Sequence, residues 1–150
     1  MVTLHEGKHY IVNNDHIATA EEAAKLSAEE GRKQTLTYQV LEKHNHSDNM
    51  EHLEIKFDSM GVYDNTYVGI LQTAYASGLK EFPMPCVFTN CHNCLCAVGG
   101  TINTDVHKYA ESACKKSGGI FVPPHEAVIH QYMREMIVKS GDMSIVSDSH

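Results

Sequence analysis

The stretch SGGIFVPPH at residues 117–125 decides how the second half of this chain folds. Two glycines end the segment before it, Ile120–Val122 is a short apolar run, and two prolines stop that run. A short apolar run between turn residues is typical of a β-strand. Two further strands are predicted at Cys86–Thr89, which we expect to be buried, and at Ser144–Ser147.

Helical patterns separate these three strands. Thr104 is the expected cap of a helix over 105–117, which ends at two glycines. A second helix is predicted over 126–138, where apolar residues recur at helical spacing. Strands that alternate with helices through short connections favour an α/β fold. We therefore predict a parallel β-α-β-α-β sheet with helices packed on it.

The first half is less regular. Thr19 and Glu22 have the spacing of a capping box, which predicts a helix starting at residue 20. Leu53, Ile55 and Phe57 alternate with polar residues, as in a strand. The predicted elements of this half are helices over 20–30, 36–44 and 66–77 and a strand over 53–57, with Gly31 ending the first helix and Gly78 the third.

Composition narrows the class of protein. The chain has 150 residues, of which 42% are apolar and 21% charged, as in a globular domain. Its formal charge of −7 argues against binding to nucleic acid or to anionic membrane. We find neither an apolar stretch of membrane-spanning length nor a secretory start, so we expect a cytoplasmic protein.

The five cysteines and 11 histidines leave two alternatives open. One is a small cytosolic metal- or redox-binding module, with Cys91, Cys94 and Cys96 as ligands. The other is a set of small buried thiols. Cys86 and Cys91 would lie roughly 17 Å apart along the predicted strand, so one metal ion does not bridge them.

Polar residues follow each predicted strand of the second half. They are Asn90-Cys91-His92, Pro123-Pro124-His125 and Asp148-Ser149-His150. Parallel sheets bind ligands at the carboxyl ends of their strands, so we expect these side chains to share one edge. A carboxylate beside an imidazole suits acid–base chemistry. The neighbours of His130 alone favour a half-buried structural histidine.

Several of these motifs, in this order, resemble the first domain of the aconitase family of iron–sulfur hydro-lyases. The resemblance covers residues 35–150 and leaves 1–34 as a weakly patterned N-terminal segment. The matching motifs are Asp64-x-Thr66, Ala76-Ser77-Gly78-Leu79, Cys91-His92, Ala97-Val98-Gly99-Gly100, the stretch 119–124, Val128-Ile129-His130-Gln131 and Ser147-Asp148-Ser149-His150.

The resemblance implies a hydro-lyase of the aconitase/isopropylmalate-dehydratase type. Such enzymes add or remove water across a carbon–carbon bond of a di- or tricarboxylic acid, and one iron of a [4Fe–4S] cluster is the Lewis acid. By resemblance, the catalytic residues are His92, His130, Asp148 and His150, and the substrate-binding residues are Ser149, Asp64, Thr66 and Gln72.

The chain also departs from the family pattern. Cys91 stands where the family has an aspartate, and Val68 stands where it has a glutamine, with Gln72 one turn later. The family's cluster-ligating cysteines and serine base lie beyond the Asp-Ser-His motif, which ends at residue 150 here. We therefore expect a partial domain that carries no cluster and is inactive alone. A second polypeptide, or self-association through an exposed sheet edge, would be its partner.

Overall fold

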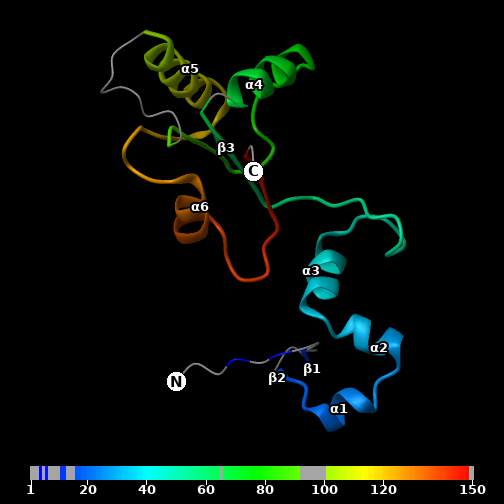
Figure 1. Cartoon of the computed structure of the whole chain (residues 1–150). Coiled ribbons are helices and arrows are strands. Elements are labelled where there is room, and N and C mark those ends of the chain that lie inside the picture. The colour runs from blue at the N-terminus through cyan, green and yellow to red at the C-terminus, as the bar shows by residue number, and fades with distance from the viewer. Residues whose placement is uncertain are drawn as a thin grey trace. The chain divides into compact units, whose positions relative to one another are not determined.

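The computed structural model describes residues 4, 6, 11–12, 16–64, 66–91 and 101–148. The chain divides into two compact units, residues 1–56 and residues 57–150 (Figure 1). The sequence analysis divides the chain after residue 34, and that domain assignment remains a prediction.

The 1–56 unit consists of short elements. An antiparallel pair of two-residue strands precedes three helices. These elements are β1 (Ile11–Val12), β2 (His16–Ile17), α1 (Ala20–Ala24), α2 (Ala28–Lys33) and α3 (Leu36–His44). The bounds of α3 confirm the helix predicted there.

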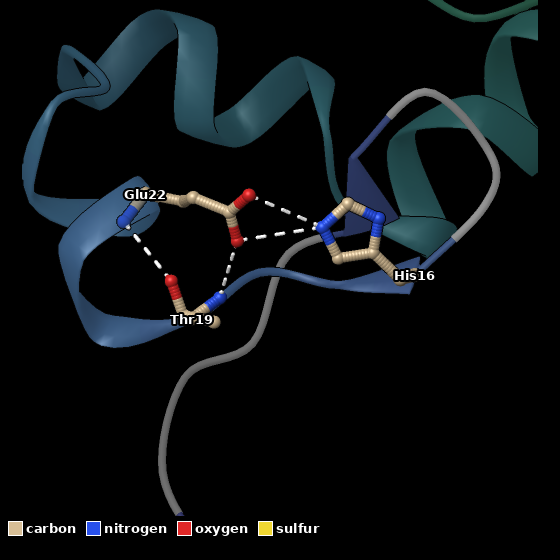
Figure 2. Close-up of polar contacts among 3 residues, drawn as sticks. All are labelled: His16, Thr19 and Glu22. Carbon is tan, nitrogen blue, oxygen red and sulfur yellow. Dashed lines mark hydrogen bonds and ion pairs between the residues drawn. The ribbon is translucent and has the colours of Figure 1, made fainter.

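The prediction of one helix over 20–30 is wrong, because Ser27 interrupts it and caps a new helix. In the first capping box, the Glu22 N–H donates to Thr19 Oγ1 at 3.3 Å and the Thr19 N–H donates to Glu22 Oε2 at 2.8 Å. Figure 2 shows this box, in which His16 Nε2 also lies 3.2 Å from Glu22 Oε1. Ser27 and Glu30 form the second box. Gly31, the expected end of the helix, is buried inside α2.

The strand predicted over 53–57 is also wrong. Of these residues, Ile55 forms an isolated antiparallel bridge with Asn45. The Asn45 side chain organises the connection, since its Oδ1 accepts from the N–H groups of Ser47 at 3.1 Å and Glu54 at 2.9 Å. Alternating apolar residues therefore lie in a loop that an asparagine holds together.

The 57–150 unit contains a four-stranded sheet in the order β5-β4-β3-β6, and every pairing in it is parallel. The α/β fold with a parallel sheet is thus confirmed. The strands are β3 (Ser59–Tyr63), β4 (Cys86–Thr89), β5 (Ile120–Val122) and β6 (Ser144–Ser147). The last three have the predicted bounds.

β3 is not predicted from the sequence. Its small residues, Ser59 and Gly61, fit close contacts with neighbouring elements instead of forming an apolar run. A Cβ on Gly61 would lie 3.1 Å from Met133 Sδ and 3.2 Å from Ile129 Cδ1, so glycine allows the next layer to approach closely. Ser59 Oγ lies 2.6 Å from Ser144 Oγ on β6. The two hydroxyls therefore satisfy each other between neighbouring strands.

Helices cover both faces of this sheet (Figure 1). On one face, α4 (Thr66–Ala76) and α5 (Thr101–Ser117) pack over a cluster that includes Val62 and Phe88. On the other, α6 (Ile129–Tyr132) and the π-helix η2 (Met133–Ile137) pack over Tyr63, Val87 and Val122. Successive residues of β3 and β4 alternate between the two clusters, as a pleated strand requires.

Two helix starts differ from the prediction. α5 begins at Thr101, so Thr104 lies inside the helix rather than at its cap. α6 begins at Ile129 rather than at residue 126. His125 has a left-handed φ of 69° after two prolines, and Val128, the N-cap of α6, has an extended backbone with a ψ of 139°, so both residues lie outside the helix. Gly78, with a φ of 91°, takes the left-handed conformation expected just after α4.

None of the helices in the described part of the chain combines the length and the apolar composition that a membrane crossing requires.

Candidate functional site

The carboxyl ends of the four parallel strands lie along one edge of the sheet. Asp64, Asn90, Pro123 and Asp148 are the residues that directly follow β3, β4, β5 and β6. The register pairs Tyr63 with Thr89, and Thr89 with Val122, so these strand ends are level with one another. Ligands of parallel α/β sheets bind at this edge, which makes it the candidate functional site.

His130 and Asp148 meet at this edge. His130 Nε2 lies 3.2 Å from Asp148 Oδ2, although the two residues are 18 positions apart along the chain. The Asp148 side chain is 6% exposed, whereas the His130 side chain is 57% exposed. The interpretation of His130 as a half-buried histidine is therefore wrong. The structure instead brings together an imidazole and a carboxylate that the family resemblance implies are both catalytic.

Local structure explains how His130 reaches the edge. Ile129, its neighbour on α6, is fully buried against the sheet and anchors the helix. His130 lies next to this anchor in the same turn, with its ring toward solvent and its Nε2 near Asp148. A buried carboxylate that contacts one ring nitrogen restricts the imidazole, while the exposed part of the ring stays available to a ligand. This arrangement suits proton transfer.

Asp64 and Thr66 lie just after the end of β3. The Asp64 side chain is fully buried, and the Asp64 N–H donates to Thr89 O at 2.9 Å. Thr66 Oγ1 donates to Tyr63 O at 2.9 Å. Both residues thus support the junction between β3 and α4 in this chain. Their expected role in substrate binding stays a prediction.

Gln72 lies on the opposite face of the sheet from His130. It is an exposed residue of α4 and lines a pocket of about 360 Å³ together with Asp105 and Tyr109 of α5. Because α4 and α6 cover different faces, the structure does not bring Gln72 to the His130–Asp148 pair.

The remaining predicted site residues lie outside the described residues. They are His92, Ser149 and His150 of the candidate catalytic and substrate-binding set, and Cys94 and Cys96 of the alternative metal site. Their roles stay predictions.

A buried hydrogen-bonded bridge fixes two of the strand ends, and sequence reasoning misses it. Asn90 Nδ2 donates to Val122 O at 2.9 Å, and the Tyr67 hydroxyl donates to Asn90 Oδ1 at 2.7 Å. Burial, with a smaller effect of the nearby Asp64 carboxylate, raises the pKa of Tyr67, so the hydroxyl keeps its proton. The bridge joins β4, β5 and α4 at the site edge. The sequence marks Asn90 as a strand-end residue but gives no sign of its partners.

The described thiols do not form a ligand set for an iron–sulfur cluster. Cys86 and Cys114 pack in the cluster under α4 and α5, and Cys91 packs on the α6 face. Burial raises the pKa of both Cys86 and Cys114 to about 12, which disfavours the thiolate that a metal requires. Among the described residues, no group of three or more His, Cys, Asp or Glu side chains is arranged to hold a metal ion.

Comparison with known proteins gives one partial match. No protein-family model matches the chain, and no solved structure matches it. A segment of 43 residues is 46% identical to a protein named 3-isopropylmalate dehydratase large subunit 2, from Archaeoglobus fulgidus. The match covers 29% of this chain and 10% of the length of that relative. Part of the chain is therefore similar to part of a dehydratase large subunit.

Proposed function

We propose that this chain carries part of the substrate side of an aconitase/isopropylmalate-dehydratase-type hydro-lyase that acts on a di- or tricarboxylic acid. The contact between His130 Nε2 and Asp148 Oδ2 at the carboxyl edge of a parallel sheet is the observation that carries the proposal. The partial similarity to a dehydratase large subunit supports it independently.

In this proposal, His130 holds or moves a proton at the substrate, and Asp148 orients its ring. His92 and His150 are the further catalytic residues, and Ser149 binds a substrate carboxylate. Proton transfer by a positioned imidazole fits the removal of a hydroxyl group as water. A carboxylate buried behind that imidazole holds the ring in one orientation, and a ring N–H in that orientation can donate a hydrogen bond to a substrate carboxylate.

The rest of the active site belongs to another part of the enzyme. The described thiols lie on two faces of the sheet and do not fit a [4Fe–4S] cluster. We therefore propose that a second polypeptide, or a further part of a longer one, supplies the cluster and the remaining residues. The name of the similar dehydratase describes it as a large subunit.

Citrate binding to the whole 150-residue chain tests the proposal. Binding is measured by isothermal titration calorimetry at about pH 6, where most free imidazole is protonated. We expect His130→Ala and Asp148→Asn each to weaken citrate binding about tenfold, because the first removes the imidazole that contacts citrate and the second removes the carboxylate that orients its ring. His46→Ala, an exposed histidine of the other unit, is the matched control and keeps the original affinity. Equal affinity in all four proteins contradicts the proposal.

A hydration assay tests whether the chain is incomplete. The chain is incubated without oxygen with iron and sulfide, and hydration of a tricarboxylate is then followed. We expect no turnover, because the described residues provide an acid–base pair but no cluster ligand set. Clear turnover by the chain alone would show that it carries a complete active site.

A further inference from the structure

A second pocket opens where β4 and β5 end. It has a volume of about 320 Å³ and is lined by Cys91, His125, Glu126, Ala127 and Val128. A thiol, an imidazole and a carboxylate therefore share one cavity, which is large enough for a small ligand. The citrate-binding proposal uses none of these residues.

Cys91 differs from the other two described thiols in its surroundings. It is partly exposed and packs on the α6 face, with its Sγ 3.5 Å from Thr89 Oγ1. Cys86 and Cys114 are buried on the opposite face, where burial raises the pKa of each thiol to about 12. Cys91, by contrast, lines this pocket.

Two polar residues, His125 and Glu126, line the pocket beside the apolar Ala127 and Val128. His125 follows the two prolines after β5 and is exposed, as is Glu126 beside it. An imidazole that shares a pocket with a thiol can take its proton and leave a nucleophilic thiolate. The Glu126 carboxylate makes the pocket unfavourable for anions, and the net charge of −7 acts in the same direction.

We propose that Cys91 and His125 form a thiol–imidazole pair that reacts with small uncharged electrophiles, with hydroperoxides as the chemical class. His125 takes the thiol proton, and the Cys91 sulfur then attacks one peroxide oxygen. A sulfur–oxygen bond forms and the oxygen–oxygen bond breaks. The sulfur is oxidised by two electrons to a sulfenic acid, and the peroxide is reduced. The departing hydroxide accepts the proton from His125 and leaves as water when the oxidant is hydrogen peroxide.

Site-resolved oxidation of the full chain tests this pair. Cys94→Ser and Cys96→Ser are introduced first, so that Cys86, Cys91 and Cys114 are the remaining thiols. The folded protein is treated with hydrogen peroxide at about pH 7, sulfenic acid is trapped with dimedone, and tandem mass spectra locate the adduct. We expect Cys91 to be labelled about tenfold faster than the two buried thiols.

His125→Asn separates a catalytic imidazole from simple exposure of Cys91. Asparagine tolerates the left-handed backbone at this position, so the loop is retained. We expect labelling of Cys91 to slow several-fold at about pH 7 and to recover at about pH 10, where an ordinary thiol ionises without a base. Equal rates for the three thiols, or no effect of His125→Asn at either pH, overturns the proposal.

Two alkylating reagents test the charge of the pocket. We expect uncharged iodoacetamide to modify Cys91 faster than anionic iodoacetate, by a larger ratio than for a small free thiol measured alongside. Glu126→Gln should bring the two ratios closer together, because it removes the carboxylate from the pocket lining. A ratio equal to that of the free thiol, or one that Glu126→Gln leaves unchanged, contradicts a pocket selective for uncharged electrophiles.

Discussion

The two compact units are stabilised by different interactions. All the buried hydrophobic side chains among the described residues belong to the 57–150 unit, where they form a cluster on each face of the sheet. Among the described residues of the 1–56 unit, the buried residues are Gly31 and His44, and neither has a hydrophobic side chain. Its helices have 5, 6 and 9 residues, below the roughly 12 that an isolated helix needs. Capping boxes begin α1 and α2, and the Thr35 side chain caps α3.

This difference bears on where a functional site can form. The His130–Asp148 contact joins α6 to the end of β6, and it holds because α6 packs on the sheet that contains β6. Two ion pairs of the 1–56 unit, His16 with Glu22 and Glu29 with Lys33, join exposed side chains close in sequence. Contacts of that kind contribute little to stability. The 57–150 unit is therefore the better suited of the two to hold catalytic side chains in a fixed geometry.

Removing a core aromatic ring should have the largest effect. Phe88 is fully buried, and its ring centre lies 5.7 Å from that of Tyr67 and 5.4 Å from that of Phe82. We expect Phe88→Ala to lower the free energy of unfolding by about 3–5 kcal/mol. Leu36→Ala, at a position 60% exposed in the other unit, should change it by less than about 0.5 kcal/mol. Urea unfolding measures both, and similar losses would contradict the difference between the units.

Breaking the buried bridge at the site edge comes next. Asn90→Ala leaves the Tyr67 hydroxyl and Val122 O without the hydrogen bonds that Asn90 makes with them. We expect a loss of about 1–3 kcal/mol in the same unfolding measurement. Asn49→Ala is the control, because Asn49 Oδ1 accepts from the nearby exposed N–H groups of Glu51 and His52. If Asn49→Ala costs as much as Asn90→Ala, burial of the bridge is unimportant.

The two units should lose stability at opposite ends of the pH scale. Burial raises the pKa of Cys86 and Cys114 from 9.0 to about 12 in the 57–150 unit. Each raised pKa stabilises the fold below pH 9.0. That contribution is lost as the pH rises toward 12, with a slope of up to about 1.4 kcal/mol per pH unit for each thiol.

At acidic pH, we expect the capping boxes of the 1–56 unit to lose stability. Hydrogen bonds from Thr19, with His16, lower the pKa of Glu22 below 4.5, and hydrogen bonds from Ser27 lower that of Glu30. A lowered pKa stabilises the caps above pH 4.5, and this contribution is lost as the pH falls below it. Amide exchange followed by NMR at both extremes separates the units. Two results would contradict a different pH response of the two units. One is loss of amide protection in the 1–56 unit at alkaline pH. The other is loss of protection at its caps in acid only after the 57–150 unit has unfolded.

The smallest effect concerns a single cap. Ser27 Oγ accepts from the Glu30 N–H at 3.2 Å, and Ser27→Ala removes that acceptor. We expect a loss of about 1 kcal/mol, confined to α2. Faster amide exchange at residues 28–33, with unchanged exchange in the sheet strands, is the expected result. Faster exchange in β3 and β4 as well would show that the units depend on each other.

The sequence predicts the fold best where hydrophobic runs and turn residues coincide. The bounds of α3, β4, β5 and β6 and the parallel sheet are confirmed. β3 is not predicted, because its serine and glycine fit contacts with Ser144 and Met133 that no local sequence pattern reveals. The helix over 20–30 fails because a serine continues a helix or caps a new one according to its neighbours.

The candidate site is less accessible to sequence reasoning than the fold. The parallel arrangement places Asn90, Pro123 and Asp148 at one edge, as the strand order predicts. The apolar neighbours of His130 in the sequence suggest burial, but its ring is exposed and lies beside Asp148. Which face of a short helix meets solvent depends on how Ile129 packs against the sheet, a tertiary contact that the sequence does not show.

The most direct test of the central claim is histidine-selective NMR of the full chain during a citrate titration. We expect the His130 ring signals to shift and saturate, and we expect Asp148→Asn to reduce this shift greatly. We also expect the signals of His16 and His44, in the unit without a hydrophobic core among its described residues, to stay in place. A His130 signal that does not move, or equal shifts at all three histidines, would contradict a carboxylic-acid site at the sheet edge.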